Sequence, residues 1–313
     1  MASSGTGLEA AAESRKPAKT ANLLYSQRLA PYIFVFPFIV SFSIFFAYPV
    51  FSTIVMSFQE VLPGATTFVG FANYEKLFNP TFYKAVMNST VYTALTLLIL
   101  IPIPLVLAVL LNAKTMLFKN VFRSITFVPA LISIVVAGII FRLMFSGQET
   151  GLANVVIGWF GFEKIAWLNS YGSSLAVLIA LALFRWMGVN LLYFLAGLQN
   201  IPTSIYEAAE IDGADTWQKF TKITLPLLKP ITIYVLTISI YGGYSMFVES
   251  YMLFAGNKSP NDIGLTIVGY LYRSGIEKFE LGFGSSVGIA LLVITFTLTM
   301  LQLKFTGMFK KED

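Results

Sequence analysis

Six long apolar segments, separated by shorter polar stretches, dominate the pattern of hydrophobic and polar positions along the chain. They cover residues 32–58, 86–111, 125–145, 174–198, 231–254 and 286–303. A bilayer core about 30 Å thick needs roughly 20 apolar residues in helical form, and each segment is close to that length. The pattern therefore predicts an all-α membrane protein with six transmembrane helices.

Prolines interrupt the first three predicted spans. They are Pro37 and Pro49 in the first span, Pro102 and Pro104 in the second, and Pro129 in the third. A broken helix is tolerated in lipid where neighbouring helices or cavity water satisfy the freed carbonyl groups. Such kinks fit either a pathway through the bundle or simple bending of the helices.

The basic residues predict how the bundle is oriented. Thirteen of the 21 Lys and Arg residues fall in tails and loops on one side, and six fall on the other. Cytoplasmic loops carry the excess of positive charge, so both termini are predicted to be cytoplasmic. Residues 1–30 are expected to form a flexible cytoplasmic tail, 31–307 the transmembrane domain, and 308–313 a second cytoplasmic tail.

Composition narrows the possible functions. Only 12% of residues are charged, about half the share found in soluble domains. The chain has no Cys and no His, which excludes disulfides, thiolate metal sites and the commonest general base. The net charge of +5 follows the loops as the positive-inside rule requires, and it does not indicate a nucleic-acid partner.

The loop at residues 199–230, between the fourth and fifth spans, holds the most informative pattern. Ser204 and Glu207 have the spacing of a capping box, and Gly213 is a natural helix stop. The helix between them would have only about two turns, too few to be stable alone in water. It must pack on its own chain or on another protein, and one face would present Ile205, Ala208, Ala209 and Asp212.

This loop resembles the EAA motif of ABC-importer permeases. The resemblance rests on Glu207, Ala208, Ala209, Gly213, Ile223, Leu225 and Pro226, at the full spacing of that motif. It implies a coupling helix that seats in a groove of a cytoplasmic ATPase. The residues that would serve this coupling are Ser204, Glu207, Ala208, Ala209, Asp212, Gly213, Ile223, Leu225 and Pro226.

Three further segments look like the carbohydrate-importing branch of that family, the maltose and glycerol-phosphate permease type. They are Phe68-Val-Gly-Phe-Ala-Asn-Tyr74, Trp186-Met-Gly188 and Asp212-Gly-Ala214. In overall texture the chain is most similar to permeases for arabinose-containing oligosaccharides. The resemblance implies a multi-pass protein of the bacterial inner membrane, a six-helix permease bundle that encloses half of a sugar pathway.

The same resemblance implies the partners. They would be a second homologous permease, two copies of a cytoplasmic ATPase and an extracytoplasmic sugar-binding protein. ATP and Mg would be used by the ATPase, and no cofactor is expected on this chain. In agreement, no phosphate-binding G-x-x-x-x-G-K-[ST] loop occurs in the sequence.

A sugar that crosses the membrane needs hydroxyl partners and flat apolar faces. The fourth and fifth spans offer these groups together with two ionisable residues, which are functional candidates by default in a membrane. The candidates are Arg185, Trp186, Asn190, Tyr193, Tyr241, Tyr244, Ser245, Phe247 and Glu249. Arg185 and Glu249 could also pair with each other, and the aromatic residues could instead anchor the membrane interface.

Two other functions compete with an importer permease. A secondary transporter would show internal repeats with broken helices at matching positions, but the sequence shows no convincing halves and the coupling loop would stay unexplained. An intramembrane enzyme would need a catalytic pair, for which the spans offer few acids and no His or Cys. The sequence therefore favours a permease that moves a carbohydrate and is not an enzyme.

Overall fold

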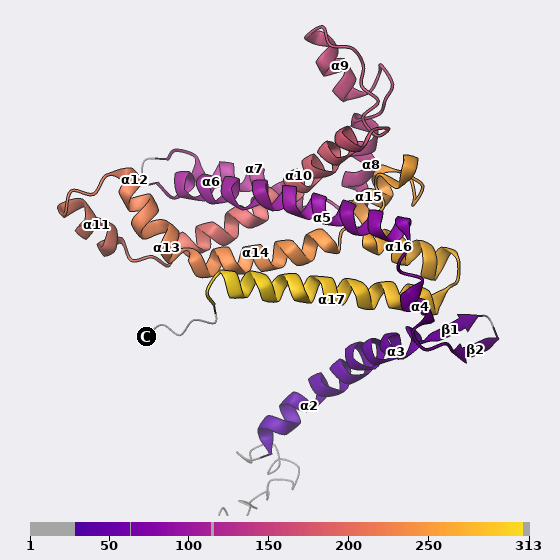
Figure 1. The fold of residues 1–313 in the computed structure, drawn as a ribbon. Helices are drawn as coiled ribbons and strands as arrows, with labels where there is room; N and C mark the ends of the chain where they lie inside the picture. The colour runs from indigo at the N-terminus through magenta and orange to yellow at the C-terminus, as the bar shows by residue number, and fades with distance from the viewer. Residues whose placement is uncertain (1–28, 63, 114–115, 309–313) are drawn as a thin grey trace, which may run out of the picture. The chain divides into compact units, whose positions relative to one another are not determined.

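The computed structural model describes residues 29–62, 64–113 and 116–308, and the chain divides into two compact units, Met1–Val55 and Met56–Asp313. The first unit contains one long helix. It begins as α2, Ala30–Phe42, passes through a π-helical turn and continues as α3, Tyr48–Met56 (Figure 1). This helix confirms the predicted first span. The two predicted tails lie almost entirely outside the described residues.

The second unit opens with a small hairpin, the only strands among the described residues. β1, Gln59–Leu62, pairs antiparallel with β2, Ala65–Phe68. A single turn of helix follows, α4, Ala72–Glu75. The side chain of Asn73, buried beneath the hairpin, donates to the carbonyl groups of Ser57 at 3.0 Å and Gln59 at 2.9 Å. Asn73 of the 68–74 segment therefore ties α4 to the hairpin.

Helices make up most of the remainder of the second unit. In chain order they are α5 Pro80–Leu100, α6 Pro102–Asn112, α7 Lys119–Phe127, α8 Ile134–Met144, α9 Leu152–Trp159, α10 Tyr171–Gln199, α11 Thr203–Ile211, α12 Thr216–Lys219, α13 Leu225–Leu227, α14 Lys229–Tyr244, α15 Val248–Leu253, α16 Ile267–Tyr272 and α17 Leu281–Phe305.

Four helical stretches are long and apolar enough to cross a membrane. They are Ala30–Met56, Pro80–Asn112, Tyr171–Gln199 and Leu281–Phe305. Two bent pairs meet the same criterion, Lys119–Leu131 with Ile134–Met144 and Thr216–Leu227 with Lys229–Tyr244. Counting each pair as one span gives six, the number that the hydropathy pattern predicts, although the pair that forms the fifth span starts within the predicted coupling loop and ends before residue 254.

The second span breaks at Ile101, between α5 and α6. Pro102 and Pro104 have no amide hydrogen to continue the helical ladder, so the carbonyls of Leu98 and Leu100 lose their usual donors. Asn190 of α10 replaces one of these donors, because its side-chain amide donates to the Leu100 carbonyl at 2.8 Å. The proline kink is therefore supported by a neighbouring helix, as membrane burial requires.

The third and fifth spans are less regular than predicted. The third turns through 96° between Leu131 and Ile134, where a short 3-10 helix that contains Pro129 ends. The fifth was predicted as one helix to residue 254, but α14 stops at Tyr244 and α15 starts at Val248. The prediction of one continuous fifth helix is thus wrong, because the backbone leaves the helical ladder at 245–247.

α10 lies at the centre of the second unit and packs against α5, α6, α7 and α14 (Figure 1). Its contact with α7 is very close. A Cβ on Gly188 would lie 2.2 Å from the Thr126 carbonyl oxygen and 2.7 Å from the Phe127 Cα. Only glycine fits at this crossing, which accounts physically for Gly188 in the Trp186-Met-Gly188 segment.

Candidate functional site

A cavity of about 480 Å³ lies inside the second unit, between α5, α10 and α14 and beside the break between α14 and α15. This volume is in the range of small-molecule sites. Its walls are aromatic rings and aliphatic side chains, interrupted by hydroxyl groups, one amide and one carboxyl group. Seven predicted pathway residues line it, Trp186, Asn190, Tyr193, Tyr241, Ser245, Phe247 and Glu249.

The remaining two predicted pathway residues lie outside the lining. The guanidinium group of Arg185 donates to the Ile132 carbonyl at 2.9 Å, which is left free where the third span bends. The Tyr244 hydroxyl bonds to the Thr90 hydroxyl at 2.8 Å and its ring is buried in the core. The structure thus gives both side chains packing partners in the protein instead of a place in the cavity.

Arg185 and Glu249 do not pair. Among the described residues three ion pairs form within 4.0 Å, Lys164–Glu149, Lys219–Glu210 and Arg273–Asp262. Glu249 instead faces the cavity near the start of α15, with only 8% of its surface exposed.

Several lining residues were not predicted. Tyr92 and Thr96 come from α5, and Tyr234 and Ser239 come from α14. Tyr92 and Thr96 are four residues apart and so share one helical face. Two polar side chains on one face of an apolar span are the sequence signal that indicates these lining positions. The ring of Tyr234 makes an edge contact with Tyr193 across α10 and α14, with ring centroids 5.3 Å apart.

The coupling loop lies at the start of α14, at the end of this helix away from the cavity (Figure 1). α11 spans nine residues, and the chain then reverses at Gly213, whose φ is +79°. The Gly213 amide donates to the Glu210 carbonyl at 3.1 Å and the Ala214 amide to the Ala209 carbonyl at 2.8 Å. These two bonds form a Schellman motif, so the predicted glycine stop is confirmed.

The predicted capping box at Ser204 is wrong. α11 begins at Thr203, one residue after Pro202, and no side chain caps it. Proline favours helix entry directly after itself because its φ is already fixed, so Ser204 lies inside the first turn. The capping box of this loop is one helix later, where Asp215 and Gln218 cap α12 reciprocally.

α11 and the segment after it are joined by side chains. The Tyr206 hydroxyl bonds to the Thr224 hydroxyl at 2.9 Å, and Lys219 pairs with Glu210 at 2.7 Å. The two most exposed large apolar residues of this loop are Ile211, at 87% exposure, and Trp217, at 70%.

The other predicted coupling residues are exposed or half-buried around these two. Glu207, Ala208 and Ala209 lie on α11, and Asp212 follows it. Ile223 lies in a short π-helical segment, and Leu225 and Pro226 lie in α13.

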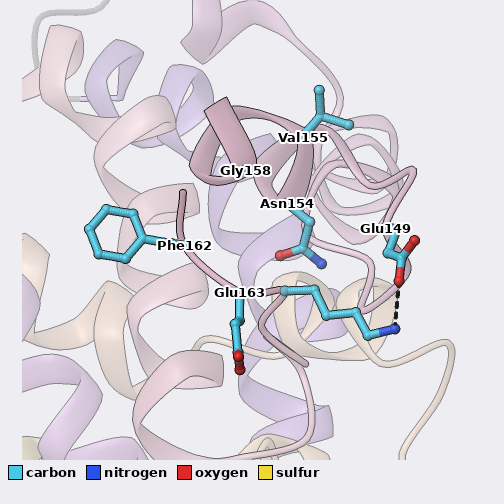
Figure 2. Close-up of a pocket in the computed structure, with 7 residues that line it drawn as sticks. Glu149, Asn154, Val155, Gly158, Phe162 and Glu163 are labelled. Atoms are coloured by element: carbon cyan, nitrogen blue, oxygen red, sulfur yellow. Dashed lines mark hydrogen bonds and ion pairs between the residues drawn. The ribbon is translucent and has the colours of Figure 1, made fainter. Parts of the chain in front are cut away.

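The loop between α8 and α10 carries a second hollow, of about 590 Å³ (Figure 2). The buried amide of Asn154 holds this loop by donating to the Gln148 carbonyl at 2.9 Å and accepting from the Trp167 ring at 2.9 Å. Lys164 lowers the pKa of Glu149 through a hydrogen bond and through its charge. This hollow is formed by an exposed loop and contains none of the predicted pathway residues.

Comparisons with known proteins agree with this architecture. Residues 101–305 match the family model described as binding-protein-dependent transport system inner membrane component. The chain is 53% identical over 291 residues, 93% of each protein, to the arabinooligosaccharides transport system permease protein AraP of Bacillus subtilis (strain 168). It is 49% identical over 300 residues, 96% of this chain and 95% of the other, to AraP of Halalkalibacterium halodurans.

Among solved structures, a chain from a bacterial ABC transporter involved in the import of the acidic polysaccharide alginate superposes with a TM-score of 0.79. The match has 24% sequence identity and covers 90% of this chain and 96% of that one. At this identity the likeness shows a shared fold. Together with the family match over more than half of the chain, it shows that this protein belongs to the binding-protein-dependent inner membrane components, the membrane-spanning permeases of ABC importers.

Proposed function

We propose that this chain forms half of the pathway for an oligosaccharide, arabinose-containing as the names of its relatives indicate. It would couple passage to ATP hydrolysis through α11. The observation that carries this proposal is that α14 connects the two candidate sites. The helix starts directly after the coupling loop and ends at the cavity wall, where Tyr241 and Ser245 lie.

The partners would be a second homologous permease, two copies of a cytoplasmic ATPase that uses ATP and Mg, and an extracytoplasmic sugar-binding protein. An uncovered Ile211 and Trp217 beside a short helix favour docking into a groove of another protein. In keeping with such an assembly, one solved relative is an alginate transporter in complex with a periplasmic protein.

The inner end of α14 is packed tightly enough to transmit movement. Leu228 is fully buried, and a Cβ on Gly197 of α10 would lie 2.9 Å from the Leu228 side chain and 2.8 Å from that of Ile231. Closure of the ATPase would move α11, and the stiff packing would pass this movement to α14. The sugar needs only to bind one of the two states of the cavity more tightly than the other to shift the equilibrium between these states.

The lining also fits a carbohydrate. Aromatic faces such as Trp186 and Tyr241 suit the apolar faces of sugar rings, while hydroxyl and amide groups such as Ser245 and Asn190 can exchange hydrogen bonds with sugar hydroxyls.

Replacement of Gly213 tests the coupling role. In Gly213→Pro the residue loses both the positive φ and the amide hydrogen that bonds to Glu210, so sugar uptake by the reconstituted complex should fall about tenfold or more. The matched control is Gly213→Asn, because asparagine tolerates a positive φ and keeps the amide. Normal uptake in Gly213→Pro would remove this loop from the mechanism.

ATP dependence separates the proposal from a secondary transporter. Proteoliposomes that contain the chain, its partner permease and the ATPase should accumulate sugar only with ATP and the sugar-binding protein. Uptake that persists after the ATPase is omitted would refute the proposed coupling.

A further inference from the structure

We infer that the cavity selects oligosaccharides by charge, and that Glu249 is the residue that excludes anionic sugars. This inference rests on the proposed sugar pathway and adds the substrate class that the pathway accepts, namely sugars without negative charge. Of the twenty lining residues, Glu249 is the only one with an acidic or basic side chain.

The lining offers no cation to an anionic sugar. Among the residues that the structure describes around the cavity, none is Lys or Arg. Arg185, whose charge acts on Glu249, is not among the lining residues, and it donates to the Ile132 carbonyl. It forms no ion pair with Glu249 within 4.0 Å. Because the guanidinium group lies outside the lining and already donates to a carbonyl, it is not presented to a sugar in the cavity.

A sugar carboxylate would meet two unfavourable conditions at this site. It would lose its hydration without gaining a cation, and it would approach a carboxyl group of the same sign in surroundings less polar than water, where repulsion is strong. A sugar hydroxyl meets the opposite condition, because it can donate a charge-assisted hydrogen bond to the same group. Glu249 thus favours neutral sugars and opposes anionic ones with a single side chain.

The fold alone does not impose this selection. A permease chain of the same fold belongs to an importer of the acidic polysaccharide alginate. Charge selection must therefore depend on which side chains line the cavity. A like-charge group placed against the wrong ligand is a common way to build such specificity.

A matched pair of ligands tests the inference. Arabinotriitol and arabinotrionate have the same length and the same open-chain end, and differ in that the second carries a carboxylate. Their binding is measured with the complex of both permeases and the ATPase in lipid nanodiscs. The sugar-binding protein is left out, because it would apply a selection of its own. The wild-type complex should bind the alditol about tenfold more tightly than the aldonate, or better.

Variants assign the selection to Glu249. In Glu249→Gln the ratio of the two affinities should fall below about threefold, because the amide keeps the size of the side chain and removes its charge. Ser245→Ala, which alters the lining without changing its charge, should keep the wild-type ratio even where both affinities fall. A wild-type ratio near one, or an unchanged ratio in Glu249→Gln, would overturn the inference while leaving the pathway intact.

If the wild-type complex binds neither ligand, the proposed pathway through this cavity fails and the inference fails with it. If Glu249→Gln does not assemble, the wild-type complex is titrated with the amino-alditol of the same length. This cationic ligand should bind at least as tightly as the neutral alditol, and weaker binding would contradict a selection by negative charge.

Discussion

Replacement of Asn190 by leucine should destabilise the bundle through one identifiable atom, the carbonyl oxygen of Leu100. Asn190 is 2% exposed and its amide donates to that oxygen at 2.8 Å. The amide of residue 104 would normally occupy this position, but Pro104 has no amide hydrogen. Leucine has the same branching and the same number of side-chain heavy atoms as asparagine but no donor, so the substitution leaves a buried carbonyl unpaired, which costs about 1–3 kcal/mol.

The measurement is the thermal midpoint of the detergent-solubilised complex. With an unfolding entropy of about 2.1 cal/mol/K per residue, a loss of 1–3 kcal/mol corresponds to a decrease of about 1.5–5 °C for a chain of this size. The decisive comparison uses Pro104→Ala, which restores an amide hydrogen four residues after Leu100. In that background Asn190→Leu should cost at least about 0.5–1 kcal/mol less, a coupling that a double-mutant cycle detects. Strictly additive effects of the two substitutions would refute this account of the kink.

Two further predictions concern the packing of α10 and the loop that precedes it. Gly188→Ala places a methyl group against the Thr126 carbonyl and should cost about 1–3 kcal/mol in thermal stability; Gly172→Ala on the same helix meets no atom within 4 Å and should have no such effect. Asn154→Leu removes the bonds that hold the loop at 146–169, so hydrogen exchange should become faster in that loop and not in the inner half of α10. Unchanged exchange in the loop would show that other contacts suffice to hold it.

Hydropathy and spacing were enough to predict the four long membrane helices and the Gly213 turn, because both depend on local properties of the sequence. Apolar length decides whether a helix can span the membrane, and a positive φ selects for glycine wherever it occurs. The prolines at 102 and 104 likewise indicate the break in the second span. These features needed no knowledge of neighbouring helices.

The features that sequence reasoning missed depend on contacts distant in the chain. Arg185 looked like a pathway residue because ionisable groups are rare in spans, and the structure instead shows it bonded to Ile132, 53 residues away. No proline lies at the break after Tyr244, so the local sequence does not indicate it. The cavity residues of α5 escaped notice because their partners lie on α10 and α14. The capping box predicted at Ser204 is wrong because α11 already begins at Thr203, with Pro202 at its N-cap position.

The straight run of α14 between the coupling loop and the cavity has a mechanical consequence. Its 16 residues make a rod about 24 Å long at ~1.5 Å per residue. If the rod pivots near Lys229, its far end sweeps roughly 0.4 Å for every degree of tilt. A rotation of a few degrees at the inner surface would thus move the cavity end of α14 by more than an ångström and so widen or narrow the cavity, while every hydrogen bond within the helix stays in place.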